Sequence, residues 1–123
     1  MPTIDTVPAR YMDAVNAASL DALRALFRED VVLHHPMGVF EGRDLVLGFY
    51  ENAVFRANTN LSGDGPVLTG GRTVAQQMLG RFPEDNGFGM PIPDQRAMDL
   101  FDCDADGRVA TITIYYLGFP SRE

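Results

Sequence analysis

Two adjacent histidines are the first residues of this sequence that could carry chemistry. His34 and His35 follow the apolar run Val31 to Leu33 and precede Pro36. The run predicts a strand, and because successive side chains of a strand point to opposite faces, only one of the two histidines can face the interior. The proline ends the strand and places that histidine at the rim of the fold. Imidazole titrates near neutral pH, so a histidine in this position suits general acid–base catalysis.

The second candidate is Asp99, in the middle of the segment AMDLF. Strand alternation places its carboxyl on the same face as the apolar Ala97 and Phe101. A carboxyl that is buried without a cation favours its neutral form, because desolvation raises its pKa. Asp99 would then donate a hydrogen bond at neutral pH. If the face is solvated instead, Asp99 is an ordinary surface acid.

The third candidate is Tyr11, which recurs at helical spacing with Val15 and Ala18 after Pro8. Proline suits a first helical turn, so the pattern predicts a helix from Pro8 with Tyr11 on its buried stripe. A phenol there is either a core aromatic with a satisfied hydroxyl or a hydrogen-bond donor at a site.

Two more helices are expected, one on each side of the strand that carries the histidines. Ser19 is a plausible N-cap for a second helix that ends at Glu29-Asp30 and has an apolar face of Leu20, Leu23, Leu26 and Phe27. Gly42 introduces a third, which runs to about Phe55. Its apolar face is Leu45, Phe49 and Ala53, with Val46 and Tyr50 beside it.

The remainder of the chain is expected to be extended. The expected strands are 61–68, interrupted at 63–66; 73–82, with Val74, Gln76, Met78 and Phe82 on one face; 95–103; and 108–119. Asp104 to Gly107 is a tight connection between the last two strands. A Gly/Pro-rich loop at 83–93 is where we expect substrate specificity to be set. Helices first and strands later predict an α+β fold, with an antiparallel sheet curled against the helices.

Composition limits the classes of function. The 123 residues, 46% of them hydrophobic, predict one domain that spans residues 1–123. The net charge of −7 argues against a nucleic-acid or membrane partner, so we expect a neutral or apolar ligand. The single cysteine, Cys103, excludes an internal disulfide. With neither a signal-peptide pattern at the N-terminus nor an apolar run of membrane length, we expect a soluble cytoplasmic protein.

No pattern in the sequence predicts a metal or a cofactor. Asp102, Asp104, Asp106 and Gly107 imitate the start of a calcium loop, but Thr113 occupies the position of the bidentate glutamate, inside a predicted strand. Adjacent histidines diverge on a strand and are a poor metal pair. There is no glycine-rich phosphate loop and no nucleophilic serine or cysteine motif.

Three segments together are similar to a known family: ARYMDAVNAASLDALRALFREDVVLHHPMG, EGRDLVLGFY and MDLFDCDADGRVATITIYY. They resemble the ketosteroid isomerases and their relatives in the nuclear transport factor 2-like superfamily, which includes the SnoaL-type polyketide cyclases. The resemblance implies a cone in which three N-terminal helices pack on a strongly curved antiparallel or mixed sheet and enclose an apolar pocket, usually in a homodimer. It is weakest between Phe55 and Pro93.

The resemblance also implies roles for individual residues. Tyr11 and a protonated Asp99 would form an oxyanion hole for the substrate carbonyl. Tyr50 would hydrogen-bond Tyr11, and Tyr116 would lie at the pocket wall. The departure is His35, which stands where the isomerases carry their aspartate base; as neutral imidazole it would be the base here.

The implied function is cofactor-free proton transfer next to a carbonyl of a hydrophobic, ring-containing substrate, steroid-like or polyketide-like. The expected substrate-binding residues are Tyr50, Gln76, Met78, Phe82, Phe101 and Tyr116, with Gln76 either a polar anchor or a surface residue. Alternatives are a cyclase or dehydratase of the same superfamily, or a non-catalytic protein that binds a hydrophobic ligand. The enzymatic interpretation requires that His35, not His34, face the pocket.

Overall fold

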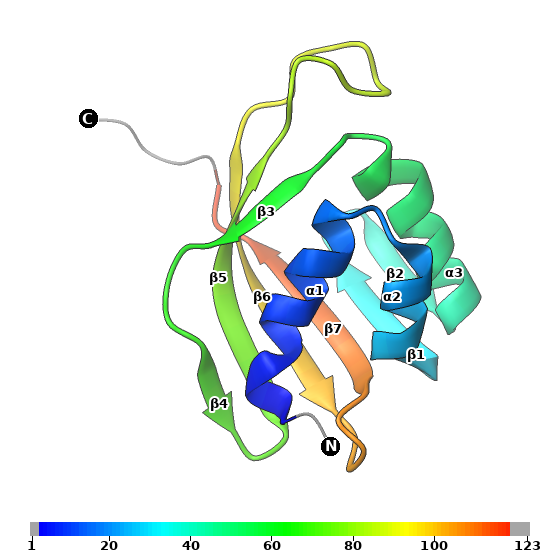
Figure 1. The fold of residues 1–123 in the computed structure, drawn as a ribbon, viewed down its shortest axis with the longest axis vertical. Helices are drawn as coiled ribbons and strands as arrows, with labels where there is room; N and C mark the ends of the chain where they lie inside the picture. The colour runs from blue at the N-terminus through cyan, green and yellow to red at the C-terminus, as the bar shows by residue number, and fades with distance from the viewer. Residues whose placement is uncertain (1–2, 119–123) are drawn as a thin grey trace.

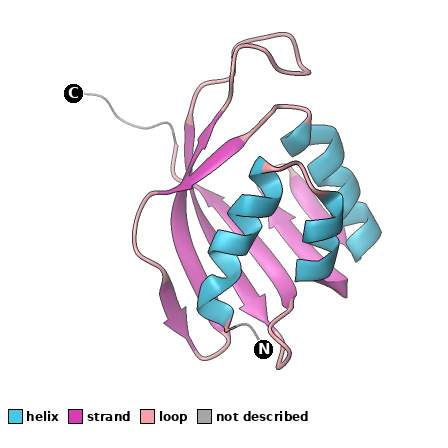
Figure 2. Cartoon of the chain, viewed as in Figure 1, coloured by secondary structure: helices cyan, strands magenta, loops and turns pink. Residues whose placement is uncertain are grey.

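A computed structural model describes residues 3–118 of the chain. Its helical elements are η1 (Ile4–Thr6, a 3-10 turn), α1 (Val7–Asn16), α2 (Leu20–Leu26), α3 (Arg43–Phe49) and the π-helical η2 (Tyr50–Phe55). Its strands are β1 (Phe27–His35), β2 (Gly38–Glu41), β3 (Asn60–Gly63), β4 (Leu68–Gly70), β5 (Thr73–Arg81), β6 (Gln95–Cys103) and β7 (Val109–Tyr116). The helices lie together on one face of the sheet (Figures 1 and 2).

The strands form one mixed sheet in the order β2-β1-β7-β6-β5-β3, and β4 pairs with β5. Only the β1–β7 pair is parallel among the described residues. The expected α+β class, with three helices packed on a curved sheet, is therefore confirmed. Within residues 3–118, no helix combines the length and hydropathy needed to cross a bilayer.

Helices α1 and α2 begin where the sequence predicts. Pro8 lies in the first turn of α1, and Ser19 caps α2 by accepting a hydrogen bond from the Ala22 N–H at 3.1 Å. Ala18 does not extend the buried stripe, because α1 ends at Asn16 and Ala18 takes a left-handed φ of 51° in the turn. The stripe of α1 buries Val7, Tyr11, Ala14 and Val15.

Helix α2 is shorter than predicted and ends at Leu26. Phe27 is extended and pairs with Val109 of β7, so it belongs to β1 together with Glu29 and Asp30. The physical reason is that tertiary pairing with β7 and complete burial of the Phe27 ring outweigh its helical spacing.

The third helix ends at Phe55 as expected, but its second half is a π-helix and its buried face differs. Leu45 is 63% exposed, whereas Val46, Leu47 and Tyr50 are buried. The face that packs on β1 is therefore rotated by one to two residues from the predicted one.

The strands follow the predicted pattern: β6 has the predicted bounds, β5 and β7 are shorter, and β3 and β4 extend to Asn60 and Gly70, beyond the expected 61–68. The interruption at 63–66 separates β3 from β4, and the tight turn before β7 is closed by Gly107 at a φ of 82°. The last strand stops at Tyr116; Phe119, its predicted end, lies outside the described residues. The segment after His35 is a hairpin and not only a rim loop, since Pro36-Met37 joins β1 to β2 with His35 opposite Gly38.

Candidate functional site

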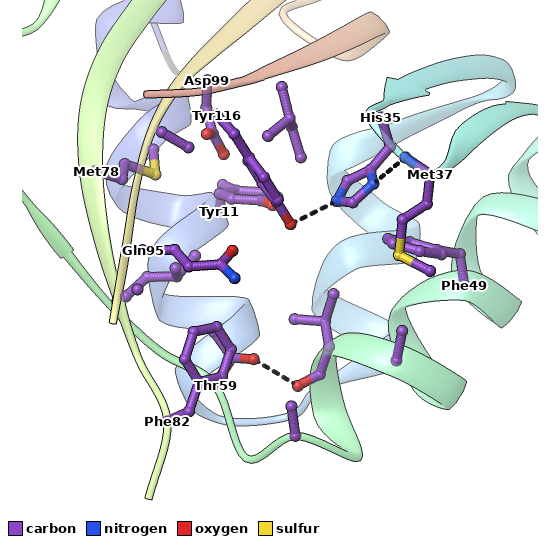
Figure 3. Close-up of a pocket in the computed structure, with 17 residues that line it drawn as sticks. Tyr11, His35, Met37, Phe49, Thr59, Met78, Phe82, Gln95, Asp99 and Tyr116 are labelled. Atoms are coloured by element: carbon purple, nitrogen blue, oxygen red, sulfur yellow. Dashed lines mark hydrogen bonds between the residues drawn. The ribbon is translucent and has the colours of Figure 1, made fainter. Parts of the chain in front are cut away.

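A cavity of about 140 Å³ lies between the helices and the sheet (Figure 3). Most of the residues that line it are apolar, and its polar groups come mainly from Tyr11, His35, Gln95, Asp99 and Tyr116. The complete lining is Tyr11, His35, Met37, Phe49, Ala53, Val54, Ala57, Thr59, Leu61, Met78, Gly80, Phe82, Gln95, Ala97, Asp99, Ile114 and Tyr116. Met37 and Tyr116 are also exposed to solvent, so they lie at the mouth of the cavity.

Strand register places two of the polar groups on the cavity wall. Ala97 of β6 lies opposite Tyr116 of β7, and Asp99 lies opposite Ile114. These four residues share one face of the sheet, so Asp99 and Tyr116 are diagonal neighbours on adjacent strands.

Asp99 is the buried carboxyl of the site, with 4% of its surface exposed. Burial raises its pKa to about 7, because the charged form loses hydration, and hydrogen bonding from Tyr11 opposes that rise. The Tyr11 hydroxyl lies 2.7 Å from the Tyr50 hydroxyl in the core behind it. Burial raises the pKa of both phenols, so each keeps its hydrogen at neutral pH.

Two residues expected to bind substrate lie behind the cavity wall. The Tyr50 side chain is fully buried; its hydroxyl pairs with Tyr11 and its ring packs edge-on against Phe49, and both of these residues line the cavity. The Phe101 ring packs edge-on against Tyr11, with ring centroids 5.1 Å apart. They do not line the cavity, because Tyr11 lies between them and it; instead they hold the Tyr11 ring in place.

His35 lines the cavity, whereas His34 is exposed on the opposite face of β1. The Met37 N–H donates to His35 Nδ1 at 3.1 Å, so Nδ1 is the unprotonated nitrogen and Nε2 carries the hydrogen of the neutral ring. Nε2 lies 3.1 Å from the Tyr116 hydroxyl. A ring flipped by 180° would place carbon at both positions and lose both hydrogen bonds. Partial burial lowers the pKa of His35, which favours the neutral ring.

The structure places Gln76 away from the cavity, unlike Met78 and Phe82, which line it. The Gln76 amide donates to the Gly65 carbonyl at 2.9 Å, in the connection between β3 and β4. That connection crosses the end of the Gln76 side chain and offers it an acceptor, so the side chain turns to the edge of the sheet.

Sequence reasoning did not assign several of the lining residues. Gln95 points its amide into the cavity, and alternation from Asp99 through Ala97 could have found it. Phe49, Ala53 and Ala57 face the cavity from consecutive turns of α3, η2 and the residues after it. The π-helical turn has a longer period than an α-helix, which also brings Val54 to this face.

The loop expected to set specificity contributes no residue to the cavity lining. It extends past the end of the sheet (Figure 1) and is attached to the residues after η2. The Asn58 amide donates to the Asp85 carbonyl at 2.7 Å, and the Arg56 guanidinium lies 4.3 Å from the centroid of the Phe88 ring. The lining is instead completed by Phe82 and Gln95, which flank the loop.

The calcium-like segment is a turn in this structure. Asp104 Oδ1 accepts hydrogen bonds from the Asp106 and Arg108 N–H groups at 2.9 Å each, which uses the carboxylate to cap the hairpin. Within residues 3–118 there is no group of three or more His, Cys, Asp or Glu side chains placed to hold a metal ion.

Helices that cover one face of a curved mixed sheet, with an apolar cavity between them, define the nuclear transport factor 2-like class of α+β proteins. Within that class, the chain belongs to the SnoaL-like domain family, whose model matches residues 9–112. No curated protein matches the sequence at a significant level.

Solved structures of the same fold include proteins named after isomerases and SnoaL. A proposed ketosteroid isomerase from Kribbella flavida has a TM-score of 0.77 at 17% identity, over 98% of this chain and 82% of that one. A SnoaL-like protein of unknown function from Burkholderia thailandensis has a TM-score of 0.72 at 22% identity, over 90% and 92%. A nuclear transport factor 2-like protein of unknown function from Cytophaga hutchinsonii has a TM-score of 0.75 at 16% identity, over 94% and 91%.

Proposed function

We propose that this chain is a cofactor-free enzyme that moves a proton at the carbon next to a carbonyl group of a small hydrophobic, ring-containing substrate. The observation that carries the proposal is the buried Asp99 carboxyl, which lines an apolar cavity beside Tyr11 and has a pKa raised to about 7. A carboxyl that titrates near neutral pH inside a cleft can both take and return a proton. The likeness to a protein named as a ketosteroid isomerase supports the same class of reaction.

The reaction needs a group that takes the proton and a group that stabilises the enolate oxygen. The cavity has a candidate for each on two different walls: Tyr11 with Asp99, and His35 with Tyr116. Hydrogen bonds to a developing oxyanion are stronger in an apolar cavity than in water. The sequence-based assignment gives the oxygen to Tyr11 and protonated Asp99, and the proton to His35. In the reverse assignment, Asp99 takes the proton, and His35 with Tyr116 stabilises the enolate oxygen; the reaction is the same.

The size of the cavity favours a substrate with one ring in the site. A dry protein cavity of roughly 150 Å³ is known to hold benzene, and this cavity has a volume of about 140 Å³. One six-membered ring therefore fits inside, and any further part of the substrate would lie at the mouth beside Met37 and Tyr116.

The direct test is isomerisation of 3-cyclohexen-1-one to its conjugated isomer, followed by ultraviolet absorbance, together with binding of phenol as an enolate mimic. We expect turnover by the purified protein and a loss of about 100-fold or more in kcat/KM for Asp99→Leu. Tyr115→Phe is the matched control, because Tyr115 is exposed and does not line the cavity. If the protein binds phenol but does not isomerise 3-cyclohexen-1-one, it is a non-catalytic binding protein and the enzymatic proposal is wrong.

A further inference from the structure

We propose that His35 serves this cavity as a hydrogen-bond donor acting through Tyr116, and that the Asp99 carboxylate takes the substrate proton. These roles are the reverse of those that the family resemblance implies. The inference rests on the proposed function, because it assigns the roles of that same cavity.

The hairpin turn prevents His35 from acting as a base toward the cavity. To accept a proton at Nε2, the neutral ring would have to carry its hydrogen on Nδ1, directed at the Met37 N–H only 3.1 Å away. The imidazolium form has the same conflict, since both of its nitrogens are donors. The Met37 amide is held in the turn between β1 and β2, where His35 pairs with Gly38. The backbone therefore selects the ring form with hydrogen on Nε2.

Tyr116 links His35 to the substrate through two successive hydrogen bonds. An oxygen that accepts from Nε2–H keeps its own hydrogen, so the Tyr116 hydroxyl at 3.1 Å can donate to a carbonyl oxygen in the cavity. Accepting one hydrogen bond strengthens the next one donated. Burial and the nearby Asp99 raise the pKa of Tyr116, so the phenol remains protonated. The His35 ring is fixed by Phe49, with ring centroids 4.7 Å apart.

Asp99 is the one carboxyl among the described residues that line the cavity. The titratable groups that face it are Tyr11 from α1, Tyr50 from η2 and Tyr116 from β7, all neutral phenols near pH 7; His35 of β1 shares the cavity. Its neighbour on β5, Gln76, is uncharged. Ionisation of Asp99 is therefore governed by burial, which opposes it, and by the hydrogen bond from Tyr11, which favours it.

The proton transfer can be written with these groups alone. The Asp99 carboxylate removes a proton from the carbon between the carbonyl and the double bond; the C–H electrons form the new C=C bond and the carbonyl π electrons move to oxygen. Tyr116 O–H stabilises that oxyanion. Protonated Asp99 then returns the proton to the γ carbon: the oxyanion electrons re-form the carbonyl, the enolate C=C electrons move to form the α,β double bond, and the β,γ π electrons form the new C–H bond. The carboxylate is restored and no other reactant is consumed. Diagonal neighbours on adjacent strands are roughly 7–8 Å apart, which leaves room for a ring between Asp99 and Tyr116.

Two conservative substitutions distinguish the two role assignments in the 3-cyclohexen-1-one assay. Glutamine at position 35 can still donate an N–H but cannot act as a base, and asparagine at position 99 can still donate but cannot take a proton. We expect His35→Gln to keep at least about a tenth of kcat/KM, His35→Ala to lose more than His35→Gln, and Asp99→Asn to lose about 1000-fold.

The pH profile gives a second criterion. If ionised Asp99 is the base, kcat/KM rises with pH through about 7 and stays high up to the phenol range. If protonated Asp99 is a donor and His35 the base, kcat/KM falls above about pH 7.

Loss of activity in His35→Gln with retention in Asp99→Asn, or loss in both, overturns the inference while the proposed function stands. A wild-type protein that binds phenol without turnover overturns both.

The ring form of His35 can be measured without a substrate. In ¹⁵N-labelled His34→Gln protein, the only imidazole signals belong to His35. We expect ¹⁵N shifts of an unprotonated Nδ1 and a protonated Nε2 from about pH 6 to pH 8. A protonated Nδ1 in this range would refute the donor role, whatever the kinetics show.

Discussion

The hydroxyl groups of Tyr11 and Tyr50 lie 2.7 Å apart in the core, although the residues are 39 positions apart in the chain. This hydrogen bond joins α1 to η2 and orients the Tyr11 ring toward Asp99. The pair therefore connects the packing of the helices to the chemistry of the cavity.

Removing the Tyr50 hydroxyl isolates the contribution of this bond. Tyr50→Phe keeps the ring that packs against Phe27 and Phe49 and deletes only the oxygen. We expect the free energy of unfolding to fall by about 1 kcal/mol, the usual net value of one hydrogen bond, as measured by urea denaturation. Tyr115→Phe, on an exposed ring, is the control and should leave stability unchanged. Equal stability of the two variants would mean that the Tyr11–Tyr50 bond contributes nothing.

The raised pKa of Asp99 predicts how stability depends on pH. Its pKa is about 7 in the folded protein and 3.8 in the unfolded chain, so between these values the unfolded chain binds fewer protons. Stability attributable to Asp99 therefore falls as pH rises from about 4 to about 7, by on the order of 4 kcal/mol. The measurement is the difference between wild type and Asp99→Asn in urea unfolding across this range. Asp30, whose pKa is lowered, contributes with the opposite sign but equally in both proteins. Parallel pH curves would show that Asp99 is not titrating in this window.

Gly80 offers a test of cavity size. A Cβ added there would lie 3.6 Å from the Gln95 carbonyl oxygen and 3.7 Å from Phe82 Cζ, which is ordinary van der Waals contact. We expect Gly80→Ala to fold normally but to narrow the cavity by one methyl group. We expect the substitution to weaken the binding of 2-naphthol more than the binding of phenol. The binding of 2-naphthol is measured by fluorescence titration, and that of phenol by its competition with 2-naphthol. Gly48→Ala, with nothing within 4 Å, is the matched control. Equal weakening of both ligands would argue against a single-ring site.

The homodimer expected from the family resemblance remains a prediction. The face of the sheet opposite the helices carries exposed apolar side chains, among them Tyr115 at 54% and Val39 at 58% exposure. Covering such a face would remove apolar surface from water. We expect sedimentation equilibrium to give the mass of two chains, and Val39→Glu to shift it toward one. A wild-type mass of one chain would refute the prediction.

The sequence alone determined the elements and the candidates for chemistry. Helical spacing found α1 with Tyr11 on its buried stripe, and alternation placed Asp99 among apolar neighbours on β6. Both are local periodicities, which depend only on backbone geometry. The same periodicity failed at Phe27 and Leu45, because partners distant in the chain decided where α2 ends and which face of α3 is buried.

The tertiary structure alone decided what each polar group can do. Which nitrogen of His35 carries the hydrogen depends on the Met37 amide in the hairpin turn. The Gln76 side chain is kept out of the cavity by its hydrogen bond to the β3–β4 connection. The type of a residue determines which of its atoms can donate or accept a hydrogen bond. Their protonation and direction follow from neighbours that folding supplies, so the chemistry of the cavity could not be assigned before the strands were paired.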